Sequence, residues 1–275
     1  MIVGPSVRQA DIRRHYDLAT LFYRLLWGPH IHHGLWEGRE SATQAQQQLT
    51  DRLAREAGIR GGERVLDVGC GMGGSSIHLA STFDCQVTGI TLSPIQRFWA
   101  STAAWARGAS PKCRFLRADA ERVCFDPRSF DVIWSIECTE HLFDKPAFFR
   151  RTAGWLDDGG RVAICAWLAG DGTSDDHTHQ VRAVCEAFLC PSLGREADYV
   201  KWMQEADLKV DRVFDWTDRV VETWEICMRR VRRTGVRWLA RWIDQNQVQF
   251  LDHFATILKA YRTGAMRYGC FIARG

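Results

Sequence analysis

The chain has 275 residues, 46% of them hydrophobic and 25% charged, and carries a formal net charge of +3 at pH 7. This length can bury a sizeable core, either as one enlarged domain or as a core with a smaller companion, while the small net charge gives no electrostatic support for a general nucleic-acid-binding role. No apolar run approaches the roughly 18 residues that span a bilayer, the N-terminus has no signal-peptide pattern, and the ten cysteines form no C-x-x-C pair, so we expect a cytoplasmic protein with reduced, buried thiols.

Residues 1–56 are expected to form a helical lid with an aromatic and histidine-rich bend at LWGPHIHHGLWEG. Residues 57–170 alternate short apolar runs with helical stretches, which is the pattern of a parallel α/β sheet. The apolar runs predict five strands, at Arg64–Val68, Gln86–Thr91, Arg114–Arg117, Phe130–Ile136 and Arg161–Trp167.

Two helices within these residues have marked ends. The helix Pro94–Arg107 follows Ser93, a candidate N-cap, and Gln96 would complete a capping box. A second helix, Pro146–Leu156, is expected to stop at DDGG, where a glycine can adopt the left-handed conformation before the next strand.

The remaining residues interleave cap and core. Residues 171–196 are interpreted as a cap insertion that begins with a solvated loop, GDGTSDDHTH, and continues with a helix at Gln180–Leu189. Residues 197–217 add a core helix and strand, 218–262 a helical cap rich in tryptophan and arginine, and 263–275 a closing core strand.

A glycine-rich turn follows the first predicted strand in the sequence VLDVGCGMGG. Glycines allow a ligand to approach the backbone, and the N–H groups that open the following helix suit a carboxylate. Asp67, directly before the turn, favours a ligand with a cationic amine. The G-x-G-x-x-G pattern alone also fits dinucleotide-dependent oxidoreductases, so it leaves that class open.

This turn resembles the first motif of class I S-adenosylmethionine-dependent methyltransferases. The segments HYDLATLFYRLLWGPHIHHGLWEG, VTGITLSPIQ, SIECTEHLFDK, CEAFLCPSLGREADYV and AYRTGAMRYGCFIARG resemble the tocopherol C-methyltransferase branch, and alkaloid N-methyltransferases, prenyl diphosphate C-methyltransferases and cyclopropane fatty-acid synthases more distantly. The resemblance covers most of the chain. It implies a Rossmann-like, mostly parallel seven-stranded sheet with an N-terminal helical lid and an inserted helical cap.

The implied reaction is C-methylation of a lipophilic prenylated, terpenoid or aromatic small molecule, with S-adenosyl-L-methionine as donor and S-adenosyl-L-homocysteine as product. One alternative is an N- or O-methyltransferase of an alkaloid-like natural product. An alternative from another class is a non-catalytic regulatory protein that binds the cofactor.

The resemblance also implies a set of donor-binding residues: Tyr16, Trp36, Asp67, Gly69, Gly71, Thr91, Leu92, Gln96, Asp119, Ala120 and Glu137. The hydroxyl of Thr91 and the side chain of Gln96 would replace the ribose-binding carboxylate of many methyltransferases, although Gln96 also suits a purely capping role. Asp119 would contact the adenine, with a surface turn as the alternative. Tyr16 and Trp36 would face the sulfonium, with core packing as the alternative.

The predicted catalytic residues are Glu140, His141 and His32. The first two end an E-x-x-E-H sequence at the carboxyl end of a predicted strand, where open α/β sheets bind ligands. In the cyclopropane-synthase relatives the matching pair helps to hold a bicarbonate base, but Glu140 could instead orient the cap. His30 and His33 are expected to position the acceptor, because a neutral imidazole suits that task near neutral pH. No metal site is expected, because no supporting ligand stands at a short spacing.

The tryptophans of the cap, Trp224 and Trp238 among them, are expected to bind a lipophilic acceptor, although most helical aromatics belong to a core. Arginines at helical spacing between Arg229 and Arg241 form a basic amphipathic stretch. A solvated face, docking on anionic lipid and binding of a prenyl diphosphate are the three interpretations. The second interpretation implies peripheral contact with a membrane. The sequence also leaves oligomerisation open.

Overall fold

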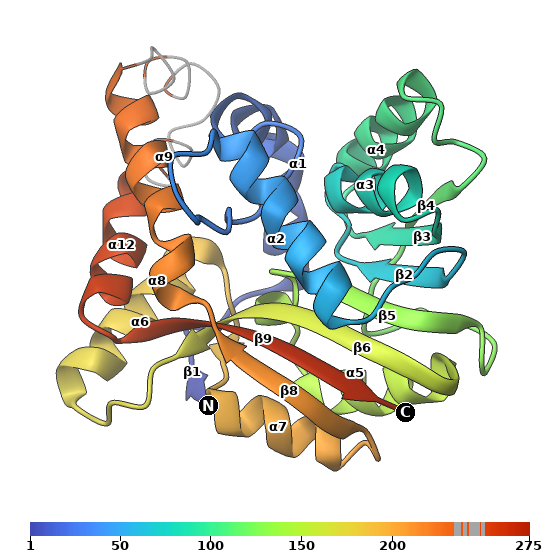
Figure 1. Ribbon diagram of the computed structural model, residues 1–275. Helices are drawn as coiled ribbons and strands as arrows, with labels where there is room; N and C mark the ends of the chain where they lie inside the picture. The colour runs from blue at the N-terminus through green and yellow to red at the C-terminus, as the bar shows by residue number, and fades with distance from the viewer. Residues whose placement is uncertain (234–237, 239–240, 242–247, 249–250) are drawn as a thin grey trace.

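A computed structural model describes residues 1–233, 238, 241, 248 and 251–275 (Figure 1). The elements that surround the sheet are β1 (Ile2–Val3), α1 (Gln9–Leu26), α2 (Ala42–Glu56), α3 (Gly74–Thr82), α4 (Pro94–Ala106), the 3₁₀ helix η1 (Thr139–His141), α5 (Lys145–Trp155), α6 (Asp175–Phe188), β7 (Ser192–Leu193), α7 (Glu196–Gln204), α8 (Thr217–Val220), α9 (Glu222–Arg233) and α12 (Phe254–Arg262).

The core is a seven-stranded sheet with the order β4-β3-β2-β5-β6-β9-β8. Its strands are β2 (Arg64–Val68), β3 (Gln86–Thr91), β4 (Cys113–Arg117), β5 (Phe130–Ile136), β6 (Leu156–Ala169), β8 (Lys209–Asp215) and β9 (Met266–Arg274). The pairs from β4 to β6 are parallel, and β9 runs antiparallel to both of its neighbours. The predicted Rossmann-like, mostly parallel sheet is confirmed.

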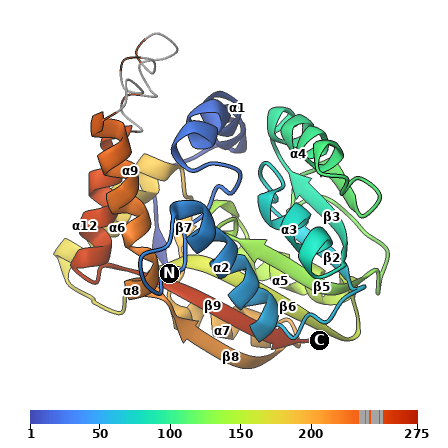
Figure 2. The ribbon, with the colours of Figure 1, turned by 45° about the horizontal axis from the view of Figure 1, so that its top comes forward.

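Helices cover both faces of this sheet. In Figures 1 and 2, α2, α3 and α4 lie over one face and α5 and α7 over the other. Helix α1 lies beside α4, and α6, α9 and α12 pack together at the end of the sheet away from β4. The carboxyl ends of the central strands therefore point toward a space bounded by α1 and by the α6–α9–α12 group.

The start of α4 follows the predicted signal in part. The Ser93 hydroxyl accepts a hydrogen bond from the Gln96 N–H at 3.1 Å, as an N-cap should. The reciprocal half of the capping box is absent, because the Gln96 side-chain oxygen instead accepts the Thr91 hydroxyl at 2.9 Å. The Gln96 side chain thus bonds to Thr91, the last residue of β3, and not to the backbone of Ser93 at the N-cap.

Two predicted boundaries are wrong. The loop GDGTSDDHTH ends early, because the Ser174 hydroxyl caps α6 by accepting the His177 N–H at 3.2 Å, and Asp175 and Asp176 occupy the favourable first turn. Strand β6 starts at Leu156, because Leu156 already pairs with Phe130 of β5. The DDGG sequence therefore lies within the strand and not in a turn before it.

The C-terminal cap is described only in part. The predicted helical cap at 218–262 contains most of α8 and all of α9 and α12, and most positions from 234 to 250, including Arg237, lie outside the described residues. Among the helices that are described, none is long and apolar enough to cross a bilayer.

Candidate active site

The glycines of the turn between β2 and α3 differ in how closely other atoms pack around them. A Cβ on Gly69 would overlap the Cys138 side chain, and a Cβ on Gly73 would lie 2.9 Å from both Ala100 Cβ and Phe115 Cζ. A Cβ on Gly71, in contrast, would meet only Ile31 Cδ1, at 3.8 Å. Packing therefore requires glycine at 69 and 73, whereas position 71 borders open space.

That open space is a cavity of about 550 Å³, which we call the turn pocket. It is lined by Ile12, Tyr16, Ile31, Gly69, Gly71, Thr91, Leu92, Ser93, Gln96, Ile136, Glu137, Cys138 and His141. The structure thus brings together most of the predicted donor-binding residues.

One buried polar atom in the turn pocket has no partner. The Gln96 side-chain oxygen is occupied by the Thr91 hydroxyl, but Gln96 Nε2 is buried without a hydrogen bond. An unsatisfied buried donor is costly. A ligand hydroxyl, such as that of a ribose, would satisfy it, so the site fits the expected adenosyl donor.

Asp67 differs from its predicted role. It does not line the turn pocket, because its carboxylate turns beneath the glycine turn and accepts the Ser76 hydroxyl at 2.5 Å. Burial raises the pKa of Asp67 to about 7, and the Ser76 hydrogen bond opposes that shift. Asp67 therefore supports the turn from below.

Asp119 lies at a neighbouring hollow, which we call the arginine hollow, whereas Ala120 does not line it. It adjoins the turn pocket at Leu92 and also contains Asp119, Arg13 and Arg117. Asp119 Oδ2 accepts Gln9 Nε2 of α1 at 2.6 Å. Ala120, which follows Asp119, is buried.

Trp36 lies outside both cavities. Its indole N–H donates to the Thr223 hydroxyl at 3.2 Å, and the Gly34 N–H donates to the same oxygen at 2.9 Å. These bonds hold Trp36 against α9, so the structure does not place Trp36 in the turn pocket with the other predicted donor-binding residues.

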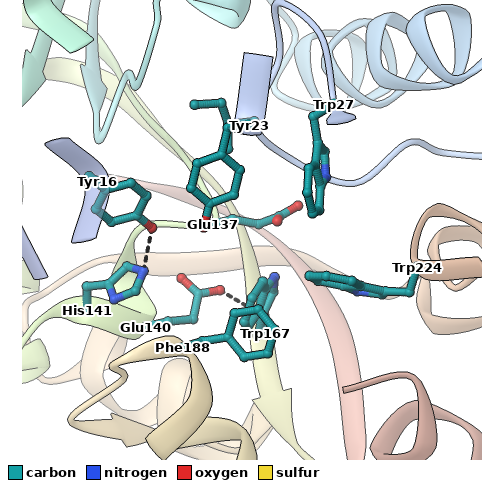
Figure 3. A pocket seen from close by; sticks show the side chains of 10 residues that line it. Tyr16, Tyr23, Trp27, Glu137, Glu140, His141, Trp167, Phe188 and Trp224 are labelled. Carbon is teal, nitrogen blue, oxygen red and sulfur yellow. Dashed lines mark hydrogen bonds between the residues drawn. The ribbon is translucent and has the colours of Figure 1, made fainter. Parts of the chain in front are cut away.

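A second cavity, of about 470 Å³, is enclosed mainly by aromatic side chains and is called the aromatic pocket (Figure 3). Its lining residues are Tyr16, Tyr23, Trp27, Ile31, Glu137, Glu140, His141, Trp167, Phe188 and Trp224. Trp224 lines one side of it and contacts Trp27 edge-on, with ring centroids 5.5 Å apart. The predicted place of Trp224 in an apolar pocket thus agrees with the structure.

Several wall residues of the aromatic pocket were not predicted, among them Tyr23, Trp27, Trp167 and Phe188. Tyr23 and Trp27 share one apolar segment and Trp167 and Phe188 lie in two others, and nothing in the local sequence separates a pocket wall from a core. Trp238, which was predicted to bind the acceptor, is 65% exposed and does not line this pocket.

Glu137 ends β5 in the left-handed conformation, with φ of 54°. Its Oε1 accepts the His33 N–H and the Tyr268 hydroxyl, both at 2.8 Å, and its Oε2 lies 2.9 Å from His33 Nδ1. Burial alone would raise the pKa of Glu137, but its electrostatic and hydrogen-bonded contacts with His33 lower it below its ordinary value. Glu137 is therefore an ionised carboxylate whose oxygens are already occupied.

His33 connects Glu137 to the wall of the aromatic pocket. The indole N–H of Trp224 donates to His33 Nε2 at 2.6 Å, so His33 Nδ1 carries the proton that Glu137 accepts. His33 therefore orients Trp224 and does not itself line the pocket, in contrast to its predicted role.

The other two histidines of the bend are also remote from both pockets. The ring of His32 is buried between the His33 carbonyl, at 2.7 Å, and the Ser75 hydroxyl, at 3.1 Å. His30 lies 3.2 Å from His32 Nε2. Both belong to a network under α2 and α3, so the structure does not support a catalytic role for His32 or acceptor binding by His30.

Glu140 presents a free oxygen to the aromatic pocket. Its Oε1 accepts the Trp167 backbone N–H, whereas Oε2 is buried without a partner. Burial raises the pKa of Glu140 to about 8. The indole N–H of Trp167, in the same pocket, is also buried without a partner.

His141 and Tyr16 form a hydrogen-bonded pair. The Leu189 carbonyl can only accept, so His141 Nδ1, 3.3 Å away, carries a proton. His141 Nε2 then accepts the Tyr16 hydroxyl at 2.7 Å. Burial lowers the pKa of His141 to about 4 and raises that of Tyr16 well above 10, so both side chains are neutral at physiological pH.

The two pockets share four lining residues: Tyr16, Ile31, Glu137 and His141. We call this set the common wall. A ligand in the turn pocket and a ligand in the aromatic pocket would meet there. Within the described part of the chain, no cluster of three or more histidine, cysteine or acidic side chains could hold a metal ion.

Comparison with known proteins assigns the chain to a family. The family model described as mycolic acid cyclopropane synthetase matches residues 5–265. A tocopherol O-methyltransferase of Arabidopsis thaliana, described as chloroplastic, is 31% identical over 94% of this chain and 80% of its own length.

Solved structures share the fold. The cyclopropane synthase MmaA2 of Mycobacterium tuberculosis superposes with a TM-score of 0.86 at 18% identity, over 99% of this chain and 100% of its own. The geranyl diphosphate C-methyltransferase of Streptomyces coelicolor, solved with Mg²⁺, geranyl diphosphate and S-adenosyl-L-homocysteine, gives a TM-score of 0.73 at 20% identity over 97% of both chains. The chain belongs to the mycolic acid cyclopropane synthetase family and is a class I S-adenosylmethionine-dependent methyltransferase.

Proposed function

We propose that this methyltransferase methylates a ring carbon of a lipophilic, hydroxylated aromatic acceptor that binds in the aromatic pocket. The observation that carries the proposal is the common wall, because it is the one place where the glycine turn and the aromatic cavity meet. S-adenosylmethionine, when bound, supplies an activated methyl group on a sulfonium. The chain would contribute orientation and exclusion of water, which can lower a barrier by roughly 7–11 kcal/mol.

The polar groups of the aromatic pocket support a hydroxyl on the acceptor. Two buried atoms lack partners, Oε2 of Glu140 and Nε1 of Trp167. A hydroxyl both donates and accepts hydrogen bonds, so one hydroxyl could satisfy the carboxyl group of Glu140 and the indole N–H together. A protonated amine would satisfy Glu140 but, because it has no lone pair, would leave the indole N–H of Trp167 unpaired.

The same contacts favour carbon over oxygen as the methylated atom. A hydroxyl oxygen that accepts the Trp167 N–H has less electron density available for attack. The ring carbon beside that hydroxyl is enolate-like and can act as the nucleophile instead. Methylation of the hydroxyl itself is the alternative, and it would require that the oxygen leave the Trp167 N–H.

Tyr16 and His141 can remove the proton that the methylated carbon must lose. The Tyr16 oxygen can accept that proton while its own passes to His141 Nε2, which is 2.7 Å away. The low pKa of His141 makes it a weak base. A weak base suffices, because a ring that has just gained a methyl cation is strongly acidic.

The experiment is incubation of the enzyme with a prenylated hydroquinone and a donor that carries a deuterated methyl group. Mass spectrometry and NMR of the product are expected to place the label on a ring carbon. A label on oxygen would replace the proposal with O-methylation. Binding of S-adenosylhomocysteine with no transfer to any hydroquinone, amine or lipid extract would instead favour a regulatory protein.

The cytoplasmic location of the protein stays a prediction.

Of the arginines in the cap, Arg229 is paired with Glu222 at 2.9 Å, and Arg237 lies outside the described residues.

A further inference from the structure

Helix α4 exposes its large apolar side chains and buries its small ones. The buried stripe is Gln96, Ala100 and Ala104. On the outside, Ile95 is 41% exposed, Phe98 65%, Trp99 40% and Trp105 76%. An amphipathic helix of a monomeric protein normally has the opposite arrangement, so this surface has the composition of a contact site.

Helix α1 continues this surface. Its outward residues Leu21 and Leu25 are 45% and 53% exposed, and α1 contacts α4 directly. The Ser93 hydroxyl at the start of α4 donates to Asp17 of α1 at 2.5 Å. Figures 1 and 2 both place the two helices on the same side of the molecule. We call Leu21, Leu25, Ile95, Phe98, Trp99 and Trp105 the α1–α4 face.

Cations surround these apolar side chains. Residues 85–118 contain five basic and no acidic residues. On the two helices, Arg14, Arg24 and Arg97 are exposed and form no ion pair among the described residues. Both acidic side chains of α1 have partners, since Asp11 accepts Arg8 and Asp17 accepts the Ser93 hydroxyl.

We propose that the α1–α4 face binds the surface of an anionic lipid bilayer. Tryptophan and arginine together favour the interface between lipid headgroups and hydrocarbon, and binding of this kind depends on apolar burial plus attraction to anionic lipid.

Helix α1 connects the proposed bilayer surface to the aromatic pocket. Tyr16 and Tyr23 project from α1 into the aromatic pocket, so the helix that touches the bilayer is also a wall of that pocket. Docking would place the pocket next to the phase in which a lipophilic acceptor dissolves. The binding surface itself does not depend on the proposed reaction, and its test needs no acceptor.

The test is sedimentation of the full-length protein with vesicles of phosphatidylcholine mixed with phosphatidylglycerol, and with vesicles of phosphatidylcholine alone. The wild type is expected to bind the anionic vesicles at least about tenfold better, and salt should release it. Equal binding to both vesicle types, or no binding to either, would overturn the proposal without reference to any variant.

Two sets of variants locate the surface. F98S/W105S and R24E/R97E are each expected to reduce binding to anionic vesicles by about tenfold, with unchanged thermal unfolding because the side chains are exposed. The matched controls are V3S, which alters an exposed residue of β1, and R150E, which alters an exposed residue of α5 on the other face of the sheet. Loss of binding in the controls, or full binding in both sets, would overturn the assignment to the α1–α4 face.

A second copy of the chain is the competing occupant. Light scattering distinguishes it, because a dimer through this face would become a monomer in F98S/W105S. If that occurs while vesicle binding stays unchanged, the face is a dimer contact and the proposal is wrong.

Discussion

The Tyr16 hydroxyl donates to His141 Nε2 at 2.7 Å although the two residues are 125 positions apart in the chain. The Leu189 carbonyl fixes the direction of this bond, because it holds the proton on the other nitrogen of His141. The lone pairs of the Tyr16 oxygen are thereby left for a ligand at the common wall.

Replacement of Tyr16 by phenylalanine tests this pair. Y16F removes only the hydroxyl, so kcat is expected to fall by a factor on the order of 10²–10⁴, the usual contribution of acid–base catalysis. Affinity for S-adenosylhomocysteine should change little. The matched control is Y23F, which removes a hydroxyl from the same helix and pocket, and equal losses in Y16F and Y23F would contradict the assigned role.

Gly71→Val is expected to abolish donor binding. The added side chain would enter the turn pocket, where only Ile31 lies within 4 Å of the new Cβ. Because Gly71 has a φ of +53°, backbone strain must be separated from occupancy of the pocket. Gly108→Val provides that control, since Gly108 has a φ of +68° and borders no pocket residue. Calorimetric titration with S-adenosylhomocysteine measures the donor affinity of both variants. Retained affinity in G71V would refute the assignment of the turn pocket as the donor site.

Asp119→Ala is expected to weaken the donor by about 1–3 kcal/mol, the cost of leaving a buried partner without its hydrogen bond. Because Asp119 also accepts Gln9, part of any loss could come from a looser α1. Gln9→Ala isolates that part. Normal donor affinity in D119A would move adenine recognition elsewhere.

Trp224→Ala is expected to raise the acceptor KM and to leave donor affinity unchanged, because Trp224 lines only the aromatic pocket. Loss of a large buried aromatic costs about 3–5 kcal/mol, part of which lowers protein stability, so thermal unfolding must accompany the kinetics. Trp238→Ala is the comparison. Because Trp238 is 65% exposed, its replacement is expected to change neither the acceptor KM nor the thermal unfolding. Wild-type acceptor kinetics in W224A would make the cap purely structural.

Glu140 should make stability depend on pH in a particular direction. Burial raises its pKa from 4.5 to about 8, so the folded state favours the protonated carboxyl. Its stabilising contribution is complete below pH 4.5 and is lost as the pH rises toward 8. Glu140→Gln cannot ionise. Denaturant unfolding at pH 4.5 and pH 8 should therefore show a smaller decrease in stability for E140Q than for the wild type, and parallel decreases would contradict the assigned protonation state.

The sequence is informative where local chemistry decides the structure. The central strands could be predicted because residues such as Val65 and Ile133 belong to short apolar runs that are buried on both faces. The glycine turn and the E-x-x-E-H sequence could also be predicted, because the residue types themselves are unusual.

The aromatic pocket could not be predicted in the same way. Trp27, Trp167 and Phe188 come from separate segments, and their spacing is equally typical of a core. His32 was misassigned for a related reason: a histidine in a bend suggests chemistry, but its hydrogen bonds to Ser75 and to the His33 carbonyl become visible only when α3 is placed.

The common wall has a consequence for inhibition. Because Tyr16, Ile31, Glu137 and His141 border both cavities, a single molecule that joins an adenosyl group to an aromatic group could occupy both at once. The second contact would then be intramolecular, so affinity could exceed that of either half by a large factor without any new interaction. Such a bisubstrate compound would draw its selectivity among methyltransferases from the aromatic half, since that pocket is lined by residues outside the glycine turn.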